Sequence, residues 1–140
     1  MLYSALVGME FLKTPRMSDS PRKVLLITGA ASGIGLAIAS HFAAADIKVM
    51  MTDRDLPLLQ KECRLLQDKG FDTEAVVCDV TSQKDIQEAV ALTIRRFGTV
   101  DILINNAGLQ YVSLIEDFPV EKFEQMIRVM LTAPFMLIRE

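Results

Sequence analysis

The feature that most constrains the fold of this chain is a glycine-rich turn at residues 28–35. An apolar run typical of a buried strand precedes the turn, and a helical pattern follows it. Gly29, Gly33 and Gly35 give the spacing G-x-x-x-G-x-G. We expect Gly29 to allow a sharp turn, Gly33 to let the backbone approach a pyrophosphate, and Gly35 to let helix and sheet pack closely. The pattern predicts a strand, a phosphate-binding turn and a helix.

Alternating strand and helix patterns continue along the chain with short connections. We expect strands at 23–28, 47–53, 73–78 and 101–105, and helices at 34–45, 55–69, 82–97 and from 119 onwards. Ser82, with Asp85 three residues later, resembles a capping box at the start of the third helix. The order implies right-handed crossovers and a parallel sheet with helices on both faces. The predicted fold is α/β: a Rossmann-type doubly wound parallel sheet, incomplete, with about four strands in the order 3-2-1-4.

The length of 140 residues allows one domain and is too short for two. We expect residues 23–140 to form an NAD-binding domain. Residues 1–22 are expected to be an N-terminal extension outside the fold, with Met17 as an alternative start to Met1. A targeting peptide is the further alternative for this extension.

Composition excludes several classes of protein. Hydrophobic residues make up 51% of the chain and the mean hydropathy is +0.30, which excludes a disordered chain. A net charge of -3 without a basic stripe excludes nucleic acid as a partner. Residues 24–45 carry no charge, but their glycines favour strand, turn and helix over a membrane span. Cys63 and Cys78 lack metal-binding spacing, so we expect no metal, free thiols and a cytoplasmic location.

Two features indicate an adenine dinucleotide as the ligand. Free backbone N–H groups suited to phosphates lie at the helix start, which comprises Ser32, Gly33, Ile34 and Gly35. Asp53 ends the second strand, where its carboxylate can accept hydrogen bonds from both adenosine ribose hydroxyls and would repel a 2′-phosphate. Asp53 therefore favours NAD over NADP, although Arg54 weakens that repulsion; the alternative role is an acid at a helix N-terminus. The turn lacks the lysine that a phosphate-loop NTPase requires.

Four motifs together resemble the short-chain dehydrogenase/reductase family. In chain order they are Thr28-Gly29-x-x-x-Gly33-x-Gly35, Asp53, Cys78-Asp79-Val80-Thr81 and Asn105-Asn106-Ala107-Gly108. The resemblance covers residues 23–140. It implies that Asp79 and Val80 lie against the adenine. It also implies that Asn106, Ala107 and Gly108 lie beneath the cofactor and stabilise the central sheet.

A narrower resemblance, at residues 108–112 and 115–123, is to bacterial 3-hydroxybutyrate dehydrogenases. It implies that Gln110 helps to hold the substrate carboxylate, for which a side-chain amide is a suitable donor. A solvated loop glutamine is the alternative. The expected reaction is NAD-dependent oxidation of (R)-3-hydroxybutyrate to acetoacetate. A 3-oxoacyl-carrier-protein reductase, or another short-chain alcohol dehydrogenase, is the alternative within the family.

Two departures from the family pattern affect catalysis. Met130 stands where the family has an asparagine that supports a proton relay. The family's Tyr-x-x-x-Lys pair, with its upstream serine, does not occur in these 140 residues. We therefore expect a cofactor-binding half that ends before the catalytic segment and is inactive alone. The longer parent is expected to be a homo-oligomer that takes a small hydroxy acid or ketone. A non-catalytic dinucleotide-binding or interaction module is the alternative from another class.

Overall fold

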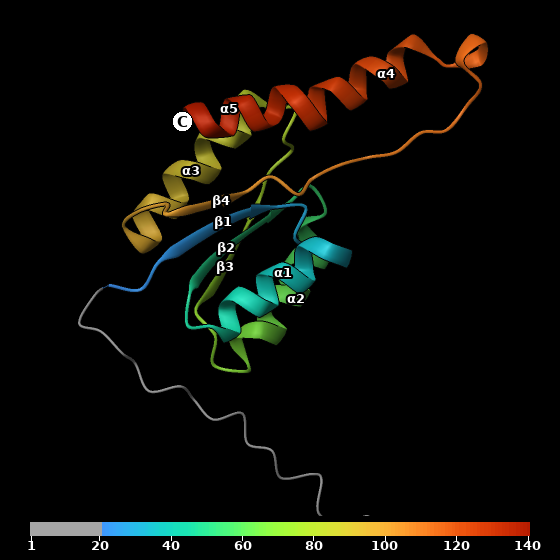
Figure 1. Ribbon diagram of the computed structural model, residues 1–140. Coiled ribbons are helices and arrows are strands. Elements are labelled where there is room, and N and C mark those ends of the chain that lie inside the picture. Colours follow the sequence, from blue (N-terminus) through green and yellow to red (C-terminus); the bar gives the residue numbers. More distant parts are fainter. Residues whose placement is uncertain (1–20) are drawn as a thin grey trace, which may run out of the picture.

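The computed structural model describes residues 21–140, and the statements below concern these residues (Figure 1). Strands and helices alternate through most of the chain. The strands are β1 (Val24–Thr28), β2 (Lys48–Asp53), β3 (Thr73–Val77) and β4 (Ile102–Ile104). The helices are α1 (Gly33–Ala44), α2 (Leu56–Gln67), α3 (Gln83–Phe97), α4 (Val120–Ile127) and α5 (Ala133–Arg139). A short 3₁₀ turn, η1, spans Ile115–Asp117, and a π-helical segment, η2, spans Arg128–Thr132.

The four strands form one parallel sheet in the order β3-β2-β1-β4, which confirms the predicted order. β1 lies in the interior, with β2 on one side and β4 on the other. In the register, Ile27 is paired with Met51 of β2 and with Ile104 of β4. The glycine-rich turn follows β1, so it emerges between the ends of two neighbouring strands. The sheet therefore places the predicted motifs together at the carboxyl ends of its strands.

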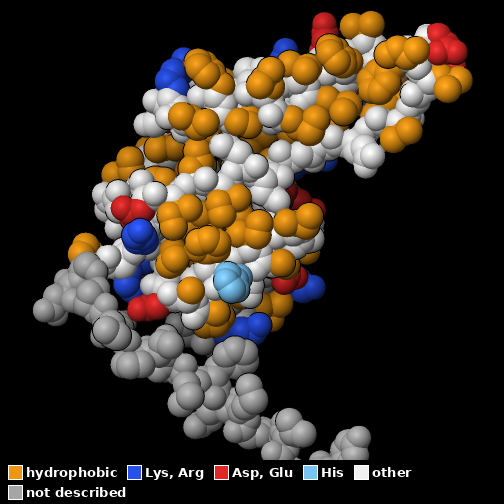
Figure 2. Space-filling model, in the orientation of Figure 1, with side chains coloured by type: hydrophobic (Ala, Val, Ile, Leu, Met, Phe, Trp, Pro, Cys, Tyr) orange, Lys and Arg blue, Asp and Glu red, His pale blue; other side chains and the backbone are white. Residues whose placement is uncertain are grey.

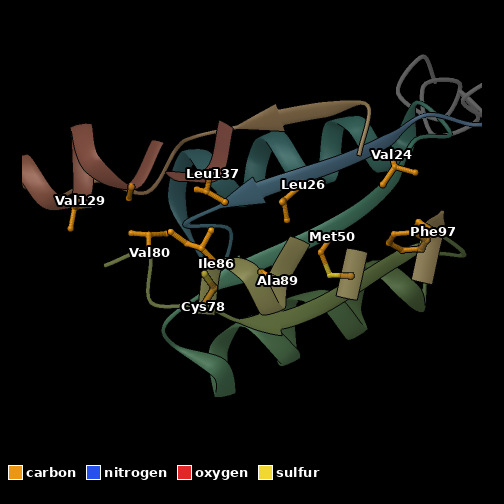
Figure 3. Packing of buried hydrophobic residues seen from close by; sticks show 11 residues of the cluster. Val24, Leu26, Met50, Cys78, Val80, Ile86, Ala89, Phe97, Val129 and Leu137 are labelled. Carbon is orange, nitrogen blue, oxygen red and sulfur yellow. The ribbon is translucent and has the colours of Figure 1, made fainter. Parts of the chain in front are cut away.

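Side chains of β1 alternate between two hydrophobic clusters because successive strand residues point to opposite faces. Val24 and Leu26 belong to the cluster under α3 and α5, in which Figure 3 shows Leu26 among side chains from several elements. Leu25 and Ile27 belong to the cluster under α1 and α2. All four side chains are buried. The result is a sheet covered by helices on both faces, as Figure 1 shows.

Polar side chains fix the starts of two helices. The Asp55 carboxylate accepts a hydrogen bond from the Leu58 N–H at 3.1 Å, which caps α2. The Ser82 hydroxyl accepts from the Asp85 N–H at 3.3 Å, as the sequence predicted for α3. The Asp85 carboxylate does not complete a capping box on the Ser82 N–H; it accepts instead from the Asp79 N–H at 3.1 Å. α3 thereby contacts the loop that precedes it.

The last helical region differs from the expectation of a single continuous helix. η2 interrupts it with five π-helical residues between α4 and α5. A π turn widens the helix locally and is often found near functional sites. β4 is also shorter than the predicted strand 101–105, because it forms a ladder with β1 only from residue 102 to 104.

The start of the described chain is held by an arginine. Arg22 donates to Asp72 at 2.7 Å and to Asp46 at 3.3 Å, which links the entry of β1 to the starts of β2 and β3. Residues 1–20 of the predicted N-terminal extension lie outside the described residues. Within 21–140, no helix has the length and apolar character needed to cross a membrane. Residues 24–45 form β1, the turn and α1.

Apolar side chains also lie exposed along the final helices. The segment after β4 runs outward from the sheet before α4 returns toward α5 (Figure 1). Hydrophobic side chains follow this helical region on the face seen in Figure 2. Phe123, Leu131 and Phe135 are each more than half exposed. Three buried residues of this region, Val129, Ala133 and Leu137, pack against the hydrophobic cluster on the α3 face of the sheet.

Candidate functional site

A cavity of about 470 Å³ lies at the carboxyl ends of the strands. This is the position at which doubly wound α/β sheets bind ligands. The structure brings all eleven residues of the predicted cofactor site to its wall: Gly29, Ser32, Gly33, Ile34, Gly35, Asp53, Asp79, Val80, Asn106, Ala107 and Gly108. Gln110, the predicted substrate residue, is exposed and is not part of this wall. The sequence motifs therefore converge on one cavity, and Gln110 lies beyond it.

Glycines determine the shape of the glycine-rich loop, which we define as residues 29–33. Gly29 and Gly33 have φ values of 66° and 55°, in the left-handed region that glycine tolerates best. A Cβ atom on Gly35 would overlap the Gly29 carbonyl oxygen and lie 2.5 Å from Asn106 Nδ2. Gly35 therefore allows α1 to begin directly against the loop and the end of β4. A Cβ on Gly33 would meet no atom within 4 Å, so this residue faces open space.

Asn106 holds the loop from the β4 side. Its amide nitrogen donates to the carbonyl oxygens of Thr28 and Gly29 at 3.0 and 3.1 Å. The Thr28 hydroxyl oxygen accepts hydrogen bonds from the backbone N–H groups of Asn106 and Ala107 at 3.1 and 3.0 Å. These four bonds give a physical basis for the stabilising position that the resemblance implies for Asn106.

β2 holds the loop from the opposite side. The Ala30 N–H donates to the Thr52 carbonyl oxygen at 3.0 Å. The next amide, the Ala31 N–H, donates to Asp53 Oδ2 at 3.1 Å. The other carboxylate oxygen, Asp53 Oδ1, accepts from the Asp55 N–H at 3.1 Å. The glycine-rich loop is thus hydrogen-bonded to both strands that flank β1.

The N-terminus of α1 is open to an anionic ligand. Ser32, at the N-cap, makes no side-chain hydrogen bond to the helix, and no acidic residue lies in the first turn. Ile34 follows with an exposed side chain. The unpaired amides and partial positive charge of a helix start stabilise a phosphate placed against them. With open space beside Gly33, the start of α1 fits a pyrophosphate.

The β3 end of the cavity is formed by residues 78–81, and Ser82 follows them as the N-cap of α3. Asp79 Oδ1 accepts from both the N–H and the hydroxyl of Thr81, at 2.8 and 2.7 Å. Asp85 accepts from the Asp79 N–H and from the Ser82 hydroxyl, the latter at 2.8 Å. These two hydrogen bonds lower the pKa of Asp85, that from Asp79 most strongly. The ionised Asp85 carboxylate therefore fixes the backbone of this loop.

Cys78 lies under the same loop and is buried. Burial raises the pKa of its thiol to about 12, and the negative charges of Asp85 and Asp79 contribute further. A thiol with this pKa carries almost no thiolate at neutral pH, and the thiolate is the reactive form. Cys78 is therefore an unreactive part of the cavity wall.

Six residues that sequence reasoning did not assign to the site also line the cavity: Arg54, Cys78, Thr81, Leu109, Gln125 and Val129. Arg54, Cys78, Thr81 and Leu109 adjoin predicted residues, so their motifs could have indicated them. Gln125 comes from α4, where the sequence carries no motif, and Val129 comes from η2, beside the family position occupied by Met130. Their position depends on the return of the final helices toward the sheet.

Fold and site together define the class of protein. A parallel sheet in the order 3-2-1-4, with a glycine-rich turn after its first strand, is a Rossmann-type fold. The family model described as short chain dehydrogenase matches residues 23–140. The chain therefore belongs to the short-chain dehydrogenase/reductase family of oxidoreductases, whose members use a nicotinamide dinucleotide.

Two relatives illustrate the sequence similarity. The uncharacterized oxidoreductase YxjF of Bacillus subtilis is 42% identical over 118 residues, which cover 84% of this chain and 46% of that protein. The D-beta-hydroxybutyrate dehydrogenase of Rhizobium meliloti is 40% identical over 122 residues, with the same two shares of 84% and 46%. The chain spans about half the length of the curated relatives it matches.

Solved structures give the same result for the fold. A short chain dehydrogenase from Mycobacterium smegmatis has a TM-score of 0.82 at 33% identity, covering 85% of this chain and 50% of that one. A 3-ketoacyl-(acyl-carrier-protein) reductase from Brucella melitensis, complexed with NADH, has a TM-score of 0.80 at 33% identity, with shares of 85% and 48%. A metagenomic short-chain oxidoreductase in complex with NADP has a TM-score of 0.80 at 29% identity, with shares of 87% and 56%.

Proposed function

We propose that this chain forms the NAD-binding part of an NAD-dependent short-chain dehydrogenase that oxidises a secondary alcohol. One observation carries the proposal: eleven residues from four separate motifs line a single cavity at the carboxyl edge of the sheet. When bound, the dinucleotide supplies the group that exchanges hydride with the substrate. The chain's own residues bind and orient that group.

Each part of the cavity suits one part of the dinucleotide. The start of α1, beside Gly33, provides backbone N–H groups for the pyrophosphate. The Asp53 carboxylate lies at the end of β2, where it can accept hydrogen bonds from the adenosine ribose. Asp79 and Val80 form the wall assigned to the adenine. Ala107 and Gly108, which follow β4 and line the same cavity, are assigned to the nicotinamide ribose.

Asp53 supports NAD in preference to NADP. A 2′-phosphate would place its negative charge beside this carboxylate, and like charges at short distance repel. Arg54 lines the same cavity and would offset part of the repulsion. The similar structures carry both NADH and NADP, so the preference proposed for this chain rests on Asp53.

We infer that the substrate is (R)-3-hydroxybutyrate, which would be oxidised to acetoacetate. The 40% identical relative from Rhizobium meliloti is a D-beta-hydroxybutyrate dehydrogenase. Gln110 is exposed beyond the cavity wall, where its amide N–H₂ is free to donate to a small carboxylate. A 3-oxoacyl-carrier-protein reductase is the second candidate, because a ketoacyl reductase structure overlays this chain with a TM-score of 0.80.

Calorimetric titration of the protein with NAD and then NADP tests the cofactor. We expect NAD to bind at least about tenfold more tightly, which corresponds to about 1.4 kcal/mol. Adenosine triphosphate serves as the control for unspecific phosphate binding at the start of α1. Equal affinity for NAD and NADP would contradict the preference, and no binding of either would contradict the proposed function.

Steady-state kinetics of the enzyme that contains this chain tests the substrate. Gln110→Ala should raise KM for 3-hydroxybutyrate at least about tenfold and leave KM for NAD unchanged, because only a substrate contact is lost. Glu116→Ala, on the same exposed segment, is the matched control. An unchanged KM for 3-hydroxybutyrate in Gln110→Ala would rule out the carboxylate role.

A further inference from the structure

We propose that Asp53 is a positioning residue for the glycine-rich loop as well as the residue that selects the ribose. Its carboxylate would hold the loop in the conformation that receives the pyrophosphate. The ribose and phosphate parts of the cavity would then depend on one side chain. The identity of the ligand in this inference rests on the proposed function, whereas the link between Asp53 and the loop does not.

The inference rests on the hydrogen bonds that the loop donates to β2. Two consecutive loop amides point to β2: the Ala30 N–H donates to the Thr52 carbonyl, and the Ala31 N–H donates to Asp53 Oδ2. The Thr52 acceptor is a backbone atom that every substitution retains. The acceptor for Ala31 is a side-chain atom and is lost when residue 53 changes. Ala31 is only 3% exposed, so water has little access to replace that acceptor.

The carboxylate has enough acceptor sites for both roles. Two carboxylate oxygens offer about four lone-pair sites. Backbone donors use one site on each oxygen, from the Ala31 N–H on Oδ2 and the Asp55 N–H on Oδ1. One site on each oxygen remains for the two ribose hydroxyls. A single Asp53 side chain, which also lines the cavity, can therefore bind the loop and the sugar at once.

The positioning role and a purely selective role predict opposite effects of removing the carboxylate on the affinity for NADP, whereas both predict weaker binding of NAD. If Asp53 only repels the 2′-phosphate, Asp53→Ala should weaken NAD and strengthen NADP. If Asp53 also holds the loop, the same variant frees the Ala31 N–H and displaces the amides that receive the pyrophosphate. Because both nucleotides contain that pyrophosphate, both should then bind more weakly.

Hydrogen exchange at the Ala31 amide tests the link without any nucleotide. We expect Ala31 to exchange at least about tenfold faster in Asp53→Ala than in the original chain, relative to the core amide of Leu26. Asp55→Ala is the matched control: it removes a carboxylate two residues away, which caps α2 at Leu58, and keeps the Asp53 side chain. An Ala31 rate that changes equally in the two variants would overturn the proposal.

Nucleotide titration of the same variants tests the consequence for binding. We expect at least a tenfold loss of affinity for both NAD and NADP in Asp53→Ala. A gain in NADP affinity with an unchanged Ala31 rate would overturn the positioning role. If the original chain binds neither nucleotide, the proposed function fails, while the Ala31 measurement still decides the positioning role. Should Asp53→Ala not fold, Asp53→Val, which likewise has no acceptor atom in its side chain, is judged by the same Ala31 criterion.

Discussion

The glycine-rich loop and the segment after β4, residues 105–119, both begin at the carboxyl end of a strand in the same sheet. They differ in the contacts that hold them in place. The loop after β1 donates hydrogen bonds to Thr52 and Asp53 of β2 on one side and accepts them from Asn106 on the other. In the described chain, Leu109 packs against the core, but the backbone hydrogen bonds that the structure shows for the segment beyond residue 107 are short-range, and the Tyr111–Phe118 ring contact at 5.3 Å is made within the segment itself. β1 has two neighbouring strands and β4 has one. A strand with two neighbours thus provides the loop that follows it with partners on both sides.

The strongest test of this comparison adds a methyl group at Gly35, beside the glycine-rich loop, and at Gly108, in the segment after β4. Gly35→Ala should destabilise the protein by at least about 4 kcal/mol, because its Cβ would overlap the Gly29 carbonyl and crowd Asn106. Gly108→Ala is the matched control, since its nearest atom would lie 3.8 Å away, and it should cost less than about 1 kcal/mol. Chemical denaturation measures both. Equal costs would show that the loop is not tightly packed.

The next largest effect compares the same truncation in the buried core and in the segment after β4. Ile86→Ala should cost about 3 kcal/mol, because Ile86 is fully buried in the cluster under α3. Ile115→Ala, in the segment after β4, should cost less than about 0.5 kcal/mol, because Ile115 is 87% exposed. Thermal unfolding of the two variants provides the measurement. A large cost at Ile115 would mean that its side chain is covered in solution.

A hydroxyl removed from β1 should have a smaller effect. Thr28→Val keeps the shape of the side chain but removes the acceptor for the Asn106 and Ala107 N–H groups. The Asn106 N–H keeps the Ile104 carbonyl as an acceptor, but the partly buried Ala107 N–H is left unpaired, which should cost about 1–2 kcal/mol. Thr132→Val, at an exposed position of η2, is the control and should be neutral. Denaturant midpoints distinguish the pair, and an unchanged midpoint in Thr28→Val would contradict the assigned role.

The smallest expected effect is a pH dependence at the loop before α3. The folded pKa of Asp85 is lowered, so its ionised form stabilises the protein above the ordinary carboxyl pKa, about 3.9. This contribution is lost as the pH falls through the lower folded value. Because solvent screens this partly exposed carboxylate, Asp85→Asn should be less stable than the original chain by only a few tenths of a kcal/mol at neutral pH, with the difference vanishing in more acidic solution. A difference that stays constant with pH would indicate a role independent of charge.

The sequence was sufficient to predict most of the fold because its apolar runs and turns are locally distinct. The strand order was predicted correctly from the alternation of strands and helices. The Gly29 turn was also correct, since a positive φ favours glycine. The motifs correctly indicated that eleven residues lie together, because each motif follows a strand and the carboxyl ends of parallel strands lie on the same side of the sheet.

Other features depended on tertiary contacts that no local pattern encodes. The π-helical η2 segment was missed because residues 128–132 have ordinary helical composition. The Asp85 carboxylate was expected to complete a capping box, but it bonds to Asp79 because the 78–82 loop folds back over the start of α3. Gln125 reaches the cavity only through the return of α4. Gln110, inferred from resemblance alone, lies outside the cavity wall.

The buried thiol of Cys78 offers a way to measure motion of the loop at residues 78–82. Because this sulfhydryl is shielded and its pKa is raised to about 12, a thiol-reactive dye can label it only while residues 78–82 are displaced. Once labelling of the second buried thiol, Cys63, is removed by a Cys63→Ser substitution, the labelling rate would measure how often the adenine end of the cavity opens. A nucleotide that rests on this loop would slow the labelling in proportion to its occupancy, which gives a binding assay that requires no catalysis.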